Sequence, residues 1–567
     1  MTREELIAFI NSKDTFDLII RRPDYIQNFS SDSNIVYAQT LGGMYDLCYT
    51  NIDYLPYVQK VLGTNFVSSV SILLGIQDTL YLDSAGITPI QYQPYLNLRG
   101  RGVIIGFIDT GIDYTLDIFR YENGESRIIS IYDQSAQCCD PPPGFFIGRE
   151  YTKEDIDRAL SSSDPYSIVQ ERDTSGHGTF LASIAAGYSR GENFSGAAPE
   201  CGIIAVKLRE ARKFYKDLFA VPDSAENVFE SNAVIAGAEY IIEKARSLGM
   251  PAVICLGMGS NSGSHDGCGI FEEYLNSISK LRGVCVCVSA GNECRAHHHA
   301  AGSIPAAGMT SDISIKVENG GNIYANIRNG AADKLSASVR SPTGELIGRV
   351  SSSPDLMITR KMVLEPSEIS IGYFFPTECS SGQLTAVRIT DATAGIWTIT
   401  LYGDIILNGT YDAWLPITGL CGRGIEFLSS SPYGTVTVPA TAQGMICCGA
   451  YDHLNGSLYL ESSWGPSRTL SMLPDLTAPG VNISGIYPTG AGTMSGTSAS
   501  AAITAGAAAL MMQWGAVLGN DPSMSTHQIK AYLIRGCRRS DPISYPNTQW
   551  GYGTLDLAQS FDRLREI

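Results

Sequence analysis

The stretch Met494-Ser495-Gly496-Thr497-Ser498-Ala499-Ser500-Ala501-Ala502 opens a run of small apolar residues that continues to Trp514. A helix that is apolar on every side is expected to be buried in a core. Ser498 falls where a glycine-containing turn becomes this helix. Free backbone N–H groups and the positive end of the helix dipole therefore lie beside its hydroxyl and can stabilise an oxyanion. Taken alone, the stretch is explained more simply by a serine that only caps the helix.

Two motifs earlier in the chain change this interpretation. The run Val103-Ile104-Ile105-Gly106-Phe107-Ile108-Asp109 is apolar and closed by an acid. This pattern is typical of a strand covered on both faces, with Asp109 at its carboxyl end, where open α/β sheets place their sites. Next, Gly176-His177-Gly178 precedes an apolar helix expected over residues 180–186. Asp, then His, then Ser is the chain order of the subtilisin triad, and it predicts nucleophilic catalysis by Ser498.

The segments 107–113, 176–186 and 493–502 resemble the three signature regions of subtilisin-like serine proteases, the subtilases. A fourth match, Ser289-Ala290-Gly291-Asn292, resembles the turn that presents the family's side-chain oxyanion donor, which maps onto Asn292. The likeness covers roughly residues 80–305 and 431–560. Phe180 stands where many subtilases have a second histidine, and Ala502 stands where they usually have proline.

The resemblance implies an α/β fold, a subtilisin-like parallel sheet with helices on both faces. It implies a serine endopeptidase in which Ser498 attacks, His177 transfers the proton and Asp109 orients the imidazole. Cys255, Leu256 and Gly257 resemble the strand that aligns the substrate, although the family usually has serine where this chain has Cys255. No cofactor is required. Subtilases often bind structural calcium, but no acidic loop with clear ligand spacing assigns a metal site here.

Residues 1–79 are expected to form a separate α+β unit. Thr2-Arg3-Glu4-Glu5 fits a capping box that opens a helix, and residues 67–76 are apolar and strand-like. The resemblance implies a prosegment that assists folding, inhibits the enzyme and stays bound after self-cleavage. Alignment with the family places the cut between Thr79 and Leu80, within a few residues either way. An unrelated docking domain and a zymogen opened by another protease remain alternatives.

The catalytic domain is expected over residues 80–309 and 431–567, interrupted by an insert at 310–430. Within the insert the helix–strand alternation gives way to short period-two runs such as Ile313-Ser314-Ile315-Lys316-Val317. This pattern, with many turn residues, predicts an antiparallel β-sandwich, and Trp397 is expected in its core or interface.

A prosegment and an inserted β-sandwich together resemble the Csp group of clostridial subtilases, in which the insert is a jelly roll. That group is named for activating a cortex hydrolase at spore germination, and it also includes members that have lost triad residues and act in germinant signalling. Three interpretations stay open: a germination protease, a regulatory protein whose site is blocked by its prosegment, and a general peptide-scavenging subtilase.

Composition limits the partners. The net charge of −17 argues against nucleic acid and against an anionic membrane surface, since both need basic protein surface. We therefore expect a protein or peptide substrate. The first 22 residues lack a sustained apolar segment, so no signal peptide is expected. The protein is therefore expected to be synthesised in the cytoplasm and then either packaged into a spore or exported without a leader.

Fourteen cysteines are present, several of them in expected buried strands, and free thiols are the favoured interpretation. The tract His297-His298-His299 fits either a metal ligand set or, more simply, a loop near Asn292.

Overall fold

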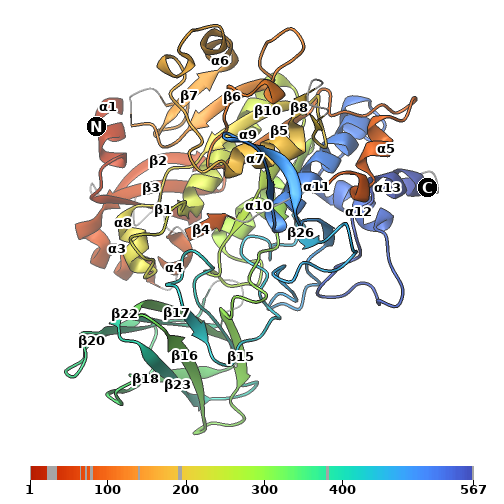
Figure 1. Ribbon diagram of the computed structural model, residues 1–567. Coiled ribbons are helices and arrows are strands. Elements are labelled where there is room, and N and C mark those ends of the chain that lie inside the picture. The colour runs from red at the N-terminus through yellow and green to blue at the C-terminus, as the bar shows by residue number, and fades with distance from the viewer. Residues whose placement is uncertain are drawn as a thin grey trace.

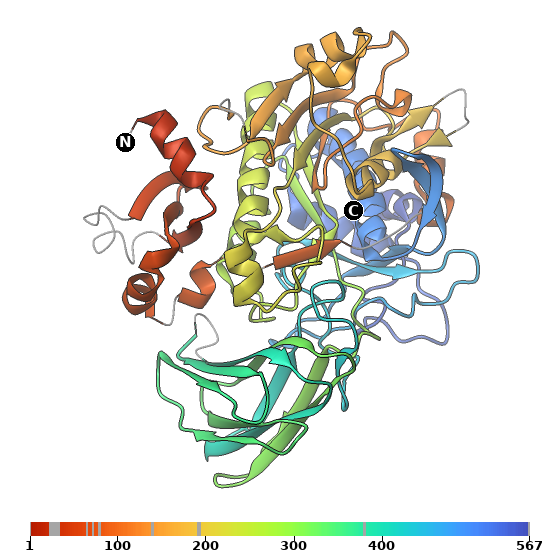
Figure 2. The ribbon, with the colours of Figure 1, turned by 60° about the vertical axis from the view of Figure 1, so that its left-hand side comes forward.

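The structure, a computed structural model, describes residues 2–21, 35–63, 66–70, 73–76, 81–137, 141–189, 194–377 and 382–564. A central α/β body carries an N-terminal unit on one side and a β unit at its lower end (Figure 1). The same arrangement is seen after rotation, with the N-terminal unit beside α9 and the β unit still projecting from the end of the body (Figure 2).

The central body is built on an eight-stranded sheet in the order β27-β26-β14-β12-β5-β10-β6-β7. Neighbouring strands are parallel except for the edge strand β7, which is antiparallel to β6. The strands are β5 (Ile104–Asp109), β6 (Ile128–Asp133), β7 (Arg149–Thr152), β10 (Gly202–Lys207), β12 (Ala252–Leu256), β14 (Val284–Ser289), β26 (Ile446–Tyr451) and β27 (Leu476–Pro479). Because the strands run parallel, their carboxyl ends meet at one edge, where sites of α/β proteins form.

Helices cover both faces of this sheet. One face packs against α9 (Ser231–Leu248) and α10 (Ile270–Ile278), and the other against α7 (His177–Ala186) and α11 (Thr497–Met512). The remaining helices of the body are α5 (Ile87–Gln91), α6 (Lys153–Leu160), α8 (Lys213–Leu218), α12 (Thr526–Gly536) and α13 (Leu557–Leu564). Two short hairpins join β8 (Tyr188–Ser189) to β9 (Phe194–Ser195) and β28 (Ile483–Tyr487) to β29 (Gly490–Met494). The predicted parallel α/β sheet is confirmed.

Helix α11 is the buried helix that the sequence predicts, since every one of its residues is buried. The stretch Thr497–Val517 is long and apolar enough to cross a bilayer, but 83% of its apolar 18-residue window is buried inside the protein. Its small side chains allow close packing: a Cβ on Gly506 would overlap the side chain of Ala197. The apolar surface of this helix is therefore buried by contacts with the sheet and with α7.

The N-terminal unit is a three-stranded antiparallel sheet in the order β1-β3-β2, with helices at its ends. Its elements are α1 (Arg3–Ile10), β1 (Thr15–Arg21), β2 (Ile35–Leu41), β3 (Tyr45–Asn51), α3 (Leu55–Leu62), α4 (Phe66–Ser69) and β4 (Leu73–Ile76). The predicted capping box at Thr2 and Glu5 is present. The expected strand over residues 67–76 is wrong in its first part, because Phe66–Ser69 form a short helix, whereas Leu73–Ile76 form the strand β4.

The inserted β unit consists of two antiparallel sheets packed around one apolar core. The first has the order β15-β24-β17-β22-β21-β20, and the second the order β19-β18-β23-β16-β25. The strands are β15 (His299–Ser303), β16 (Thr310–Val317), β17 (Gly321–Asn329), β18 (Lys334–Arg340), β19 (Leu346–Val350), β20 (Leu356–Lys361), β21 (Glu368–Phe374), β22 (Gln383–Ala392), β23 (Gly395–Ile405), β24 (Thr410–Trp414) and β25 (Ile425–Phe427). The first strand begins at His299, ahead of the expected boundary at residue 310, because His299–Ser303 pairs with β24.

Trp397 lies in the core of this β-sandwich on strand β23, and its indole N–H donates to the carbonyl of Thr393 at 2.9 Å. Its neighbour Ile396 points to the opposite face of the same strand and is 51% exposed. The period-two alternation expected from the sequence is thus present at this strand.

Trp397→Ala should destabilise the β-sandwich by about 3–5 kcal/mol, because it removes a fully buried aromatic ring and leaves a cavity. The matched control Ile396→Ala should change the stability by no more than about 0.5 kcal/mol, as surface substitutions do. Thermal unfolding followed by circular dichroism measures both variants. Equal shifts would contradict the placement of Trp397 in the core.

Candidate active site

Asp109 and His177 meet at the carboxyl edge of the sheet. Asp109 is the last residue of β5, and His177 is the first residue of α7. The two side chains are buried, and His177 Nδ1 lies 2.7 Å from Asp109 Oδ1. With the proton on Nδ1 donated to the carboxylate, Nε2 is the nitrogen that can accept a proton from a nucleophile.

Ser498 lies in the first turn of α11, after Gly496, whose φ of +153° is rarely adopted by residues with a side chain. The Ser498 hydroxyl donates to the carbonyl of Gly257 at 2.8 Å. A Cβ added to Gly257 would lie 3.2 Å from His177 Cε1 and 3.2 Å from Ser498 Cβ. The imidazole and the serine side chain therefore border the same small space, and the structure brings the three predicted triad residues together.

Asp173 holds the two elements that carry Asp109 and His177. One oxygen accepts from the Thr110 hydroxyl and the Gly176 N–H, both at 2.8 Å. The other oxygen accepts from the N–H and the hydroxyl of Thr179, at 2.8 and 2.7 Å. Asp173 was not among the predicted site residues, although it stands four residues ahead of His177, where an acid can cap the helix that follows.

Asn292 lies beside the N-terminus of α11, as an oxyanion donor must. Its Oδ1 accepts from the backbone N–H of Thr497 at 3.0 Å and from the Thr497 hydroxyl at 3.1 Å. A backbone N–H can donate to the oxygen of an amide side chain but not to its NH₂ group, so this contact fixes the orientation of the Asn292 amide. The Nδ2 donor is therefore turned away from Thr497.

A strand of the N-terminal unit lies in the cleft. β4 is the middle strand of a three-stranded antiparallel sheet, between β11 (Phe229–Glu230) and β13 (Met258–Gly259). Ile76 is opposite Met258, and Gly75 is opposite Gly259. The segment thus approaches Gly257 and Ser498 as an extended peptide, with its backbone paired on both sides.

The predicted substrate strand leads into this sheet. Cys255 and Leu256 are buried at the end of β12, where they pair with β14. Gly257 lies beside Ser498. Met258 and Gly259, which follow directly, pair with β4, and substrate binding by Cys255, Leu256 and Gly257 stays a prediction.

Thr437 is a further residue of the cleft that the sequence did not reveal. It is buried, and its backbone N–H donates to Ala290 O at 2.9 Å. A Cβ on Gly291 would lie 2.7 Å from Thr437 Cγ2, and one on Gly259 would overlap the Thr437 hydroxyl. Thr437 therefore fills the space between the two glycine backbones that flank the site.

The three consecutive histidines have separate surroundings. His297 contacts Ser430, His298 contacts Glu293, and His299 contacts Asp412. Across the described residues, no group of three or more His, Cys, Asp or Glu side chains is placed to hold a metal ion. The cysteines within the described ranges are free thiols.

A serine beside a buried Asp–His pair, at the N-terminus of a helix on a parallel sheet, defines a serine peptidase of the subtilisin class. A family model described as the Subtilase family matches residues 100–326 and 428–553, which together make up more than half of the chain. The chain belongs to the subtilase family.

The CspB protease of Clostridium perfringens, a solved structure, is similar to this chain with 31% sequence identity and a TM-score of 0.74. The match covers 86% of this chain and 99% of that structure. Subtilisin-like protease SBT2.2 of Arabidopsis thaliana is 34% identical over 147 residues, which span 22% of this chain and only 17% of the plant protein. The similarity supports a subtilase of the Csp type.

Ser498→Ala, His177→Ala and Asp109→Asn should each lower turnover by about 10⁴- to 10⁶-fold while leaving a folded chain. The three groups act as one unit, so the double variant Ser498→Ala/His177→Ala should be hardly slower than either single variant. Hydrolysis of a fluorogenic peptide, with circular dichroism as the folding control, tests this. A Ser498→Ala rate above about a hundredth of wild type would refute the assignment.

Proposed function

We propose that this protein is a serine endopeptidase that cleaves its own N-terminal unit and then protein substrates. The observation that carries the proposal is the pairing of β4 with β13, which brings an extended segment next to Gly257. The carbonyl of Gly257 accepts a hydrogen bond from the Ser498 hydroxyl. A peptide held in this way presents a carbonyl to the nucleophile.

The proposed mechanism follows from the geometry. The Ser498 hydroxyl turns from Gly257 O toward His177 Nε2, which takes its proton as the oxygen attacks the peptide carbonyl. Asp109 holds the imidazole through Nδ1 and stabilises the cation that forms. Asn292 Nδ2 and the Ser498 backbone N–H receive the oxyanion, each such donor contributing about 10²- to 10³-fold to the rate. His177 then returns the proton to the leaving amine, and a water molecule hydrolyses the acyl-enzyme.

The bond predicted from the sequence for the first cut, Thr79–Leu80, lies outside the described residues. We propose cleavage there, a short distance along the chain from Ile76, the last residue of β4.

Freshly made wild-type chain should appear as two fragments on a denaturing gel, and Ser498→Ala should remain whole. Cleavage within one molecule gains about 7–11 kcal/mol over a bimolecular encounter, so it is expected in the first turnover. Intact mass spectrometry locates the bond. Equal cutting in both chains would assign the cleavage to another protease, whereas a bond far from Thr79–Leu80 would refute only the position proposed for the cut.

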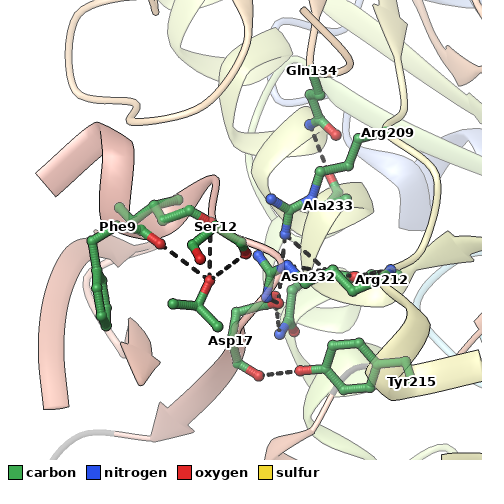
Figure 3. A network of polar contacts seen from close by, with 12 residues as sticks. Phe9, Ser12, Asp17, Gln134, Arg209, Arg212, Tyr215, Asn232 and Ala233 are labelled. Carbon is green, nitrogen blue, oxygen red and sulfur yellow. Dashed lines mark hydrogen bonds and ion pairs between the residues drawn. The ribbon is translucent and has the colours of Figure 1, made fainter. Parts of the chain in front are cut away.

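We propose that the N-terminal unit stays bound after this cut, held by a buried ionic cluster (Figure 3). Asp17 of β1 is 1% exposed and accepts hydrogen bonds from Arg212 and, at 2.7 Å, from Asn232. Arg209 lies 3.5 Å from Asp17 and 3.0 Å from Glu230, which belongs to β11 in the cleft wall. Burial opposes ionisation of Asp17, but Arg212 and Arg209 outweigh it and hold its pKa below the usual range.

Asp17→Asn should release the cleaved N-terminal fragment, because Arg209 and Arg212 would lose the carboxylate of this fragment and keep only Glu230, which belongs to the body. Removing one member of a buried pair costs about 3–5 kcal/mol, which weakens retention at least about a hundredfold. Gel filtration of the cleaved protein measures whether the fragment comigrates with the body. Asp53→Asn, an exposed acid of the same unit, is the control and should keep the fragment.

The lowered pKa of Asp17 gives this retention a pH dependence. The stabilisation is present above the ordinary aspartate pKa and is lost as the pH falls through the lower value in the docked state. Retention that is unaffected both by Asp17→Asn and by acid would contradict the proposal.

The physiological role can be proposed from the Csp likeness. We propose that the substrate is the zymogen of a cortex hydrolase at spore germination, supported by the similarity to the CspB protease over nearly all of that structure. Loss of germination without loss of growth on peptides in a knockout would support this role over general peptide scavenging.

A second candidate is a regulatory protein whose site is blocked, and the occupation of the cleft by β4 favours it. Labelling of the purified protein by a fluorophosphonate separates the two candidates, because only an accessible Ser498 reacts. An unlabelled protein that has nevertheless cut itself once would support the regulatory role.

A further inference from the structure

Glu293 directly follows Asn292, and its carboxylate is 2% exposed. The carboxylate joins three segments of the chain. Oε2 lies 2.7 Å from His298 Nδ1 and accepts from Asn261 Nδ2 at 3.3 Å. Oε1 accepts from the backbone N–H of Thr418 at 2.9 Å.

Two of these contacts lead to the β-sandwich. Thr418 lies just beyond β24, on the segment that leaves the first sheet of the sandwich. The Asn261 amide, which follows the cleft strand β13, also donates to the carbonyl of Leu415 on that segment at 3.0 Å. Glu293 therefore binds the sandwich on one side and the wall of the cleft on the other.

The backbone of the turn that carries Asn292 is also restrained by two hydrogen bonds. The Glu293 N–H donates to the Ser463 hydroxyl at 3.0 Å, and the Gly291 N–H donates to the Thr497 hydroxyl at 3.1 Å. A Cβ on Gly291 would lie 2.6 Å from the same Ser463 oxygen. A shift of the Glu293 carboxylate would therefore be transmitted directly to Asn292.

The contact between Glu293 and His298 is a buried ion pair. Burial of His298 opposes its charge, but the Glu293 carboxylate outweighs this and raises the pKa of the imidazole to about 10. Removing either charge would leave the other buried without an opposite charge, so the turn would rearrange.

We infer that Glu293 is a positioning residue that makes the oxyanion donor Asn292 depend on the docked β-sandwich. The inference rests on the proposed function, because it takes Asn292 to be that donor. Glu293 itself touches no reacting atom. It acts by holding the turn that aims the Asn292 amide at the space beside Ser498.

Self-cleavage supplies the assay, because it needs no added substrate. The full-length chain is made by cell-free translation, and the first-order conversion of whole chain to fragments is timed for wild type, Asn292→Ala, Glu293→Gln and the double variant. Asn292→Ala should slow self-cleavage about 10²- to 10³-fold, as loss of one oxyanion donor does. Glu293→Gln should slow it about tenfold to a hundredfold, as small misplacements of catalytic groups do.

The double variant distinguishes positioning from a general structural role. If Glu293 acts through Asn292, the double variant should be no slower than Asn292→Ala, within about threefold. A purely structural defect would instead multiply the two losses. Glu150→Gln is the matched control, since Glu150 lies only 14% exposed in an ion pair with Lys244 at the far edge of the sheet. It should keep the wild-type rate.

Folding is checked in chains that also carry Ser498→Ala and so stay whole. If Glu293→Gln does not unfold cooperatively there, His298→Gln replaces it, because that variant keeps the carboxylate and its bond to Thr418 while removing the cation. The double variant His298→Gln/Asn292→Ala should likewise cleave itself no more slowly than Asn292→Ala alone.

Two results would overturn the inference alone: a wild-type rate for Glu293→Gln, or losses that multiply in the double variant while Asn292→Ala by itself is slow. A wild-type rate for Asn292→Ala would overturn the oxyanion assignment in the proposed mechanism and the inference with it. The outcomes therefore separate failure of the inference from failure of the function.

Discussion

The hydrogen bond between His177 and Asp109 requires a helix and a strand to approach more closely than most side chains allow. A Cβ on Gly178 would overlap the carbonyl of Gly111, so only glycine lets α7 begin against the loop that follows β5. Asp173 then holds both elements with four hydrogen bonds. The pair is buried, so its geometry is set by backbone packing rather than by side-chain choice, and the rest of the site is arranged around it.

The sequence predicts this part of the site well, because its constraints are local. Neighbouring residues are enough to predict each of its three motifs: a buried strand closed by an acid, a histidine between glycines, and a serine ahead of an alanine-rich helix. The pairing of Met258 and Gly259 with β4 was not predicted, since nothing local shows which segment of the chain will lie beside them. The helix at Phe66–Ser69 was missed because tertiary packing overrides an apolar, strand-like run.

The contacts that the sequence could not reveal join residues far apart in the chain. Asp17 meets Arg209 and Arg212, and Glu293 meets Thr418, across separations that no periodicity encodes. Both are buried carboxylates with specific donors, in a chain whose overall charge is strongly negative. Burial makes each partner necessary, because an unpaired charge in such a place is costly. The N-terminal unit is thus connected to the body by ion pairs, and the β-sandwich by a hydrogen bond to a buried carboxylate, in addition to apolar packing.

The two halves of the catalytic site depend on different parts of the fold. The Asp109–His177 half is built entirely from the central sheet and α7. The oxyanion half begins at Asn292, and the β-sandwich starts a few residues later, at His299. The insert thus leaves the body close to the oxyanion turn, and Glu293 binds the connection between the sandwich strands β24 and β25 at Thr418. In our proposal, proton transfer is therefore assembled by the core alone, whereas stabilisation of the oxyanion by Asn292 is tied to the docking of the insert.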